Sequence, residues 1–191
     1  RAYRFHQPPA SLSVSADRVL PELRVVETAA LSIGDERIVL SSQLDVTVAR
    51  AGIFALALGI PAGYDVETLT GQEVSHWDEI KEDGTRGVRV HFQKQVLDTR
   101  RLHIVLARAE KGIESAMRLP RLDVRGAAKQ TGTLVVSGER GIRLSTASRD
   151  GAVETNPREL GVSDPRALAY SILRPGWSVT LAAERLAPTL K

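Results

Sequence analysis

The strongest constraint on the fold is a period-two alternation of apolar and polar side chains between Ile38 and Val48, which only Val39 and Ser42 interrupt. A period of two over these eleven residues places the apolar side chains on one face of an extended chain, whereas a buried helix stripe needs a period near 3.6. The segment therefore predicts a long β-strand with one buried face. The apolar face comprises Ile38, Leu40, Leu44, Val46 and Val48, and the polar face comprises Ser41, Gln43, Asp45 and Thr47.

The preceding segment, residues 23–33, alternates in the same way, and a short loop joins it to the long strand. This loop predicts a hairpin register in which Ile33 faces Ile38. Glu27 then falls opposite Leu44 and interrupts an apolar face. Two interpretations of Glu27 remain open. It is either a catalytic or partner-pairing carboxylate with a raised pKa or, as we favour, a residue that a β-bulge turns to solvent.

The next turn, residues 50–52, suits a three-residue hairpin loop in which glycine takes a left-handed conformation. It predicts a third strand beside the long one, with Phe54 facing Val48. Further short strands follow, separated by glycine and proline turns. The pattern predicts an all-β fold, either an antiparallel β-sandwich or a larger supersandwich. These further strands are expected near residues 64–70, 74–80, 87–93, 101–107, 113–119, 121–126, 132–137 and 141–147.

One or two single-turn helices are expected near residues 157–168. Asn156 and Asp164 are both N-cap residue types, and each is followed by a proline at the first helical position. No other segment of the sequence favours a helix.

The two ends of the sequence resemble each other. Residues 3–24 align without a gap with residues 170–191, and seven positions are identical. Such an internal period indicates a repeated structural unit. We therefore expect residues 1–169 to form one all-β module and residues 170–191 to be the opening strand of a second copy, packed on the first.

Composition excludes several classes of function. Arginine and lysine exceed aspartate and glutamate by only 26 to 23, with no basic cluster, so we expect no nucleic-acid partner. No apolar run approaches the roughly 18 residues of a membrane span. Cysteine is absent, which excludes disulfides and thiolate metal sites. The dinucleotide, P-loop, HExxH, GxSxG and EF-hand motifs are also absent, and we expect no cofactor.

Two stretches carry a resemblance to a known class of protein. They are the run AGIFALALGIPAGYDVETLTGQEVSHWDE, residues 51–79, and the terminal pattern with proline, serine, an acidic residue and arginine at fixed spacing. Together they resemble the serial all-β modules of long bacterial proteins. The resemblance implies a secreted or envelope location, which the sequence otherwise leaves unknown, and no assigned activity. In outline the chain is also similar to supersandwich domains of the galactose-mutarotase type.

His91 and His103 are the first candidate site. A hairpin centred at Leu97 places them opposite each other on the outward face, where two imidazoles can hold a metal ion or respond to pH. The alternative is two unrelated surface histidines, because no third metal ligand is identifiable.

Trp77, Tyr64 and Trp177 are the second candidate site, an aromatic platform for carbohydrate. Alternation places Trp77 on the face opposite His76 and Asp78, so that whole cluster cannot line one site. Core packing is the competing interpretation for Trp77.

These observations lead to three functional hypotheses. The first is a non-catalytic structural or interaction module, whose partners are neighbouring modules of the same parent chain. The second is a carbohydrate-binding module with a polysaccharide partner. The third is a glycosidase or a mutarotase-like enzyme, for which Asp78, Glu79, Glu82 and Asp83 are the nearby acidic residues.

Overall fold

The computed structural model describes residues 19–82, 84–110 and 114–186, and their fold is all-β, as predicted. The strands form three sheets. From edge to edge, the seven-stranded sheet contains β12 (Ala152–Thr155), β13 (Leu168–Ile172), β10 (Ala127–Gly138), β1 (Glu22–Ile33), β2 (Arg37–Ala49), β7 (Thr99–Ala109) and β4 (Asp65–Gly71). The four-stranded sheet contains β5 (Val74–Glu82), β6 (Thr85–Val96), β3 (Ile53–Gly59) and β9 (Asp123–Val124). The three-stranded sheet contains β11 (Ile142–Asp150), β14 (Ser178–Arg185) and β8 (Ala116–Arg118).

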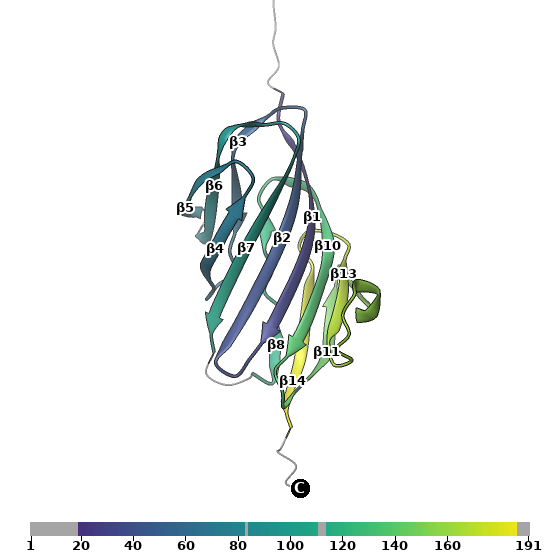
Figure 1. Cartoon of the computed structure of the whole chain (residues 1–191). Coiled ribbons are helices and arrows are strands. Elements are labelled where there is room, and N and C mark those ends of the chain that lie inside the picture. Colours follow the sequence, from purple (N-terminus) through teal and green to yellow (C-terminus); the bar gives the residue numbers. More distant parts are fainter. Residues whose placement is uncertain (1–18, 83, 111–113, 187–191) are drawn as a thin grey trace, which may run out of the picture.

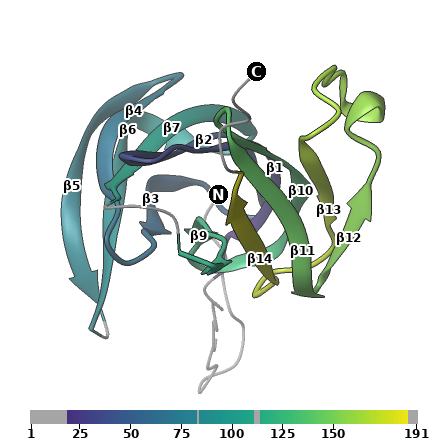
Figure 2. The same ribbon diagram turned by 90° about the horizontal axis from the view of Figure 1, so that it is seen from below.

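The seven-stranded sheet forms one layer, and the two smaller sheets cover one of its faces (Figure 1). Figure 2 shows the large sheet curving around β3, β9 and β14. The arrangement is the layered, sandwich-like fold that the strand pattern predicts.

The hairpin at the centre of the large sheet has the predicted register. Ile33 of β1 faces Ile38 of β2. The reversal is closed by a hydrogen bond of 2.9 Å from the backbone N–H of Gly34 to the carbonyl of Arg37. Along both strands the side chains that face the smaller sheets are buried and those on the other face are more exposed, in the alternation that the sequence shows.

β3 does not continue this sheet, so the predicted pairing of Phe54 with Val48 is wrong. β2 pairs with β7, and β3 pairs instead with β6 and β9. Arg50 takes a left-handed conformation with φ of 68° near the point where the chain leaves the large sheet. Alternation predicts which side chains are buried. It does not distinguish a neighbouring strand from a strand in the facing layer, because both bury the same side chains.

The chain crosses between the same two sheets again after β3, after β4 and at the turn between β6 and β7. The backbone N–H of Val48 donates a hydrogen bond of 3.1 Å to the carbonyl of Asp98 in that turn. The crossings after β2 and after β6 are thus tied together at one end of the molecule.

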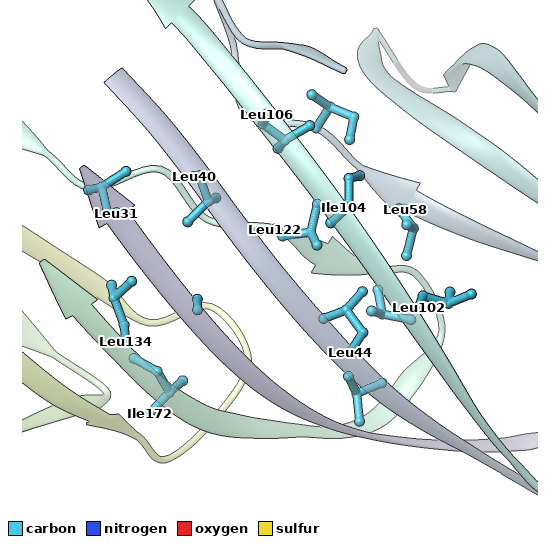
Figure 3. Packing of buried hydrophobic residues seen from close by; sticks show 14 of the residues in the cluster. Leu31, Leu40, Leu44, Leu58, Leu102, Ile104, Leu106, Leu122, Leu134 and Ile172 are labelled. Atoms are coloured by element: carbon cyan, nitrogen blue, oxygen red, sulfur yellow. The ribbon is translucent and has the colours of Figure 1, made fainter. Parts of the chain in front are cut away.

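The hydrophobic core lies between the large sheet and the two smaller ones. Figure 3 shows leucine and isoleucine side chains of the large sheet packed toward Leu58 of β3 and Leu122, which precedes β9. Burial of this apolar surface is the main stabilising contribution in such a fold. The residues of the large sheet labelled there are Leu31, Leu40, Leu44, Leu102, Ile104, Leu106, Leu134 and Ile172.

The segment predicted to open a second module, residues 170–191, begins inside β13. That strand lies between β12 and β10, and β14 lies between β11 and β8. Tyr170 is fully buried, and its hydroxyl lies 2.8 Å from Oγ1 of Thr146. Most of the matching copy, residues 3–24, lies outside the described residues, so the division into modules stays a prediction.

One of the two expected helical turns forms, as the 3-10 helix η1 (Pro157–Leu160). Oδ1 of Asn156 accepts a hydrogen bond of 3.0 Å from the N–H of Arg158. Asp164 accepts a similar bond from Arg166, but no helix follows it. Among the described residues η1 is the only helix, so none has the length and apolar character needed to cross a membrane.

Candidate functional site

The predicted pairing of His91 with His103 is wrong. His91 lies on β6 and His103 lies on β7, which belongs to a different sheet. The prediction fails because the chain crosses between two sheets at the turn between β6 and β7, whereas a simple hairpin would keep both strands in one sheet. Nε2 of His103 lies 3.1 Å from Oγ of Ser41 on the large sheet.

His91 instead pairs with His76 on β5, the neighbouring strand of the four-stranded sheet. The two imidazole rings stack with centroids 4.5 Å apart and planes 5° from parallel. Oδ2 of Asp78 lies 3.2 Å from Nε2 of His91 and 3.6 Å from Nε2 of His76. The sequence correctly places His76 and Asp78 on one face of a strand, but it does not identify the neighbouring strand that supplies His91.

The three rings of the predicted carbohydrate platform do not form one surface. Tyr64 is 3% exposed and Trp177 is 4% exposed. Both border one groove, whereas Trp77 borders a different hollow beside the turn between β4 and β5. Trp77 is half-buried and packs against the core, as its competing interpretation proposed.

Glu27 is buried, so the predicted bulge toward solvent is wrong. Its side chain is 6% exposed, and its carboxylate accepts hydrogen bonds from Oγ of Ser42 at 2.8 Å and Nε2 of Gln130 at 3.2 Å. Burial raises its pKa, while the two hydrogen bonds act in the opposite direction. A carboxylate enclosed in this way has no access to a substrate.

A groove of about 700 Å³ opens where residues of all three sheets meet. It is the hollow with the most distinctive chemistry, because four arginines and two carboxylates line it. Pockets of this size commonly hold small ligands. The lining residues are Gly59, Ile60, Pro61, Ala62, Tyr64, Glu82, Thr85, Arg108, Arg118, Leu119, Pro120, Arg121, Asp123, Arg125 and Trp177.

Two of the arginines are held in place by carboxylates. Arg125 forms an ion pair with Glu82 and donates a hydrogen bond of 3.2 Å to the carbonyl of Thr85. Arg108 forms an ion pair with Glu110, and its guanidinium carbon lies 5.5 Å from the centre of the Tyr64 ring. These contacts fix two positive groups at the edge of the groove.

The other two arginines carry less compensated charge. Nη1 of Arg121 donates a hydrogen bond of 2.9 Å to the carbonyl of Trp177, a neutral acceptor. Arg118, at the end of β8, makes no ion pair with any described residue. The groove therefore has a local excess of positive charge.

Three buried N–H groups beside the groove have no acceptor among the described residues. They are Nε of Arg108, Nε of Arg121 and the indole Nε1 of Trp177. Buried donors are normally hydrogen-bonded, so a cluster of unsatisfied donors is unusual. The excess positive charge of the groove suits an anionic ligand such as a carboxylate, whereas the three buried donors themselves have almost no accessible surface.

No family model and no curated protein matches this chain. Solved structures with the same fold do exist. An M1 zinc metallopeptidase from Deinococcus radiodurans matches with a TM-score of 0.53 and 12% identity, over 84% of this chain and 42% of that one. A structure described as a two-domain M1 zinc metallopeptidase, bound to L-tryptophan, matches over 43% of its length at 11% identity, again with a TM-score of 0.53.

Native leukotriene A4 hydrolase from Saccharomyces cerevisiae matches with a TM-score of 0.54 and 14% identity, over 94% of this chain and 32% of that one. The chain thus spans less than half of each of these proteins. At such identities the likeness shows a common fold.

These matches correct the functional expectation. The sequence favoured a non-catalytic structural or interaction module of a multi-module bacterial protein, with a carbohydrate-binding module and a glycosidase or mutarotase-like enzyme as alternatives. The fold is instead shared with parts of zinc metallopeptidases and of leukotriene A4 hydrolase. The expectation was wrong because a strand pattern identifies an all-β class, and many unrelated functions share that class.

Proposed function

We propose that this chain is the all-β, peptide-binding part of a protein related to the zinc metallopeptidases. The observation that carries the proposal is the fold match, which covers 84% of this chain but only 43% of a peptidase described as having two domains. The remainder of such a protein would supply the catalytic domain.

The sequence itself supports the proposal that the catalytic zinc site lies outside these 191 residues. Zinc peptidases commonly hold their ion with two histidines of an HExxH helix, and that motif is absent from all 191 residues. The residues of this chain therefore do not fit that zinc site, and we derive no hydrolytic step from them. The contribution of this chain is to bind part of a peptide.

The arginine-lined groove is the place where we expect the peptide to bind. Every unmodified peptide ends in a carboxylate, and the planar guanidinium group of arginine binds a carboxylate with two parallel hydrogen bonds. Structures of the Deinococcus peptidase include one with a Tyr-Ser-Ala substrate bound. A groove of about 700 Å³ has room for a peptide of this length.

Calorimetric titration of the 191-residue chain with Tyr-Ser-Ala and with its C-terminal amide tests the proposal. We expect the free carboxylate to strengthen binding by about tenfold or more, since a charge-assisted hydrogen bond contributes about 1.5–3 kcal/mol. Arg118→Ala should remove most of this preference. Arg118→Lys should restore only part of it, because lysine retains the positive charge but cannot form two parallel hydrogen bonds to a carboxylate.

Arg143→Ala is the matched control, because Arg143 is an exposed arginine of β11 that does not line the groove. It should leave both affinities unchanged. Equal affinity for the acid and the amide, or no binding of either at millimolar concentration, would refute the proposal.

A further inference from the structure

His76, Asp78 and His91 form a compact cluster on the face of the four-stranded sheet that points away from the core. His76 and Asp78 lie two residues apart on β5, and His91 lies opposite His76 on β6. One nitrogen or oxygen atom from each of the three side chains lies within 4.8 Å of the other two. None of these residues lines the arginine groove.

A β-bulge creates this cluster. Val74 pairs with Phe92, whose side chain faces the core, and regular pairing from there would place His76 opposite the buried Val90. The register instead shifts between Val74 and His76, so that His76 meets His91 on the outer face. Bulges of this kind are enriched at functional sites because they redirect a side chain.

The spacing of the three atoms suits a tetrahedral metal ion. Nε2 of both histidines approaches the same atom, Oδ2 of Asp78, at 3.6 Å and 3.2 Å. With metal–nitrogen bonds of about 2.0–2.1 Å, tetrahedral ligand atoms lie about 3.3 Å apart. To reach one ion, the two rings must turn out of their parallel stack so that both Nε2 lone pairs point to the same place beside Asp78.

One of the two histidines has a hydrogen-bond partner at its other ring nitrogen. Oγ of Ser75 lies 3.1 Å from Nδ1 of His76, the ring nitrogen that does not face Asp78. A hydrogen bond at one imidazole nitrogen leaves the other available to bind metal, and such partners are typical of metal-binding histidines.

We propose that His76, Asp78 and His91 bind one divalent transition-metal ion, with Zn²⁺ as the first choice. Two imidazole nitrogens and one carboxylate oxygen form a ligand set that Zn²⁺ commonly takes, with a fourth position left for water. Ca²⁺ and Mg²⁺ prefer sets made of oxygen atoms only, so we do not expect them to bind here. The site does not depend on the proposed peptide groove.

Metal binding would strengthen the edge of the four-stranded sheet. β5 is an edge strand of that sheet, and β6 is the sheet neighbour that holds it. Because the ligands come from both strands, a bound ion crosslinks them. We therefore expect the melting temperature to rise with Zn²⁺ concentration, as it does for any ligand that binds only the folded state.

The test uses the untagged, chelator-treated chain titrated with ZnCl2 by calorimetry and with CoCl2 by visible absorption. We expect one ion per chain, and a Co²⁺ spectrum of nitrogen and oxygen ligation. His76→Ala and His91→Ala should each weaken Zn²⁺ binding by about tenfold or more. Circular dichroism of each variant checks that the fold is retained, which we expect because both side chains are at least partly exposed.

The remaining histidines of the sequence provide matched controls. Of four histidines in the chain, His103 lies on the large sheet and His6 lies outside the described residues. His103→Ala and His6→Ala should leave Zn²⁺ affinity unchanged. The proposal is overturned if no ion binds, or if binding survives both His76→Ala and His91→Ala.

Discussion

Gln130 and Glu27 are joined inside the core by a hydrogen bond of 3.2 Å, from Nε2 of the amide to Oε2 of the carboxylate. Nε2 of Gln130 also donates to the carbonyl of Leu122 at 2.9 Å, and its Oε1 accepts from the N–H of Val124 at 3.0 Å. Gln130 therefore connects the large sheet to the segment that carries β9. Glu27, the polar residue that interrupts the apolar face of β1, is therefore part of a hydrogen-bonded network between two layers.

Glu27→Gln should make stability less dependent on pH. Burial raises the pKa of Glu27 above its ordinary value of 4.5. Between about pH 4.5 and the raised pKa, Glu27 is protonated in the folded protein but ionised in the unfolded chain. The free energy of unfolding therefore falls as pH rises through this range. Glutamine has no such dependence. In urea unfolding between pH 4 and pH 8, the stability of the variant relative to the natural protein should increase with pH. Parallel curves would contradict this.

Gln130→Ala should lower the free energy of unfolding by about 3 kcal/mol, because it leaves the buried partners of three hydrogen bonds unsatisfied. Gln130 is 2% exposed. Gln95→Ala is the control, since Gln95 is exposed and makes only a 3.4 Å contact with the carbonyl of Gly52. Its effect should stay within about 0.5 kcal/mol. Equal losses in the two variants, measured by urea unfolding, would argue against a role for the network.

The part of the fold that the sequence predicts well is local. The loop after Ile33 determines the register of the central hairpin, and alternation along β2 identifies its buried face. The burial of Glu27 was not predictable, because its partner Gln130 lies 103 residues away. The resemblance to serial modules of long bacterial proteins is not tested by these observations and stays a prediction.

The candidate sites depend on long-range pairing that the sequence does not specify. His91 was recognised, but its neighbour is His76, because β6 and β7 lie in different sheets and a bulge at Ser75 shifts the register. The arginine groove combines residues from all three sheets. Such a site becomes visible only when the topology is known. A close spacing of Arg118, Arg121 and Arg125 was the only local signal.

Gly132→Ala should prevent correct folding or destabilise the protein by more than about 3 kcal/mol. Gly132 lies beside Glu27 in the parallel pair of β10 and β1, and a Cβ atom there would lie 1.9 Å from the carbonyl oxygen of Glu27. Backbone of a central strand cannot move aside cheaply. Gly59→Ala is the matched control.

At Gly59 a Cβ atom would meet its nearest neighbour, Cβ of Asp123, at an ordinary 3.4 Å. Soluble yield and thermal melting of the two variants give the comparison. If the two variants have the same melting temperature, β1 and β10 do not approach each other as closely as the structure shows.

Trp177 should report peptide binding in the groove. The chain has two tryptophans, and only Trp177 lines the groove, next to Arg121, which donates to its carbonyl. In the Trp77→Phe variant, Trp177 is the only tryptophan. Adding Tyr-Ser-Ala should shift or quench its fluorescence emission, with the same midpoint as the calorimetric titration. In Trp177→Phe the remaining Trp77, which borders another hollow, should not respond. A response confined to Trp77 would place the peptide beside the turn between β4 and β5, and would exclude the arginine groove as its site.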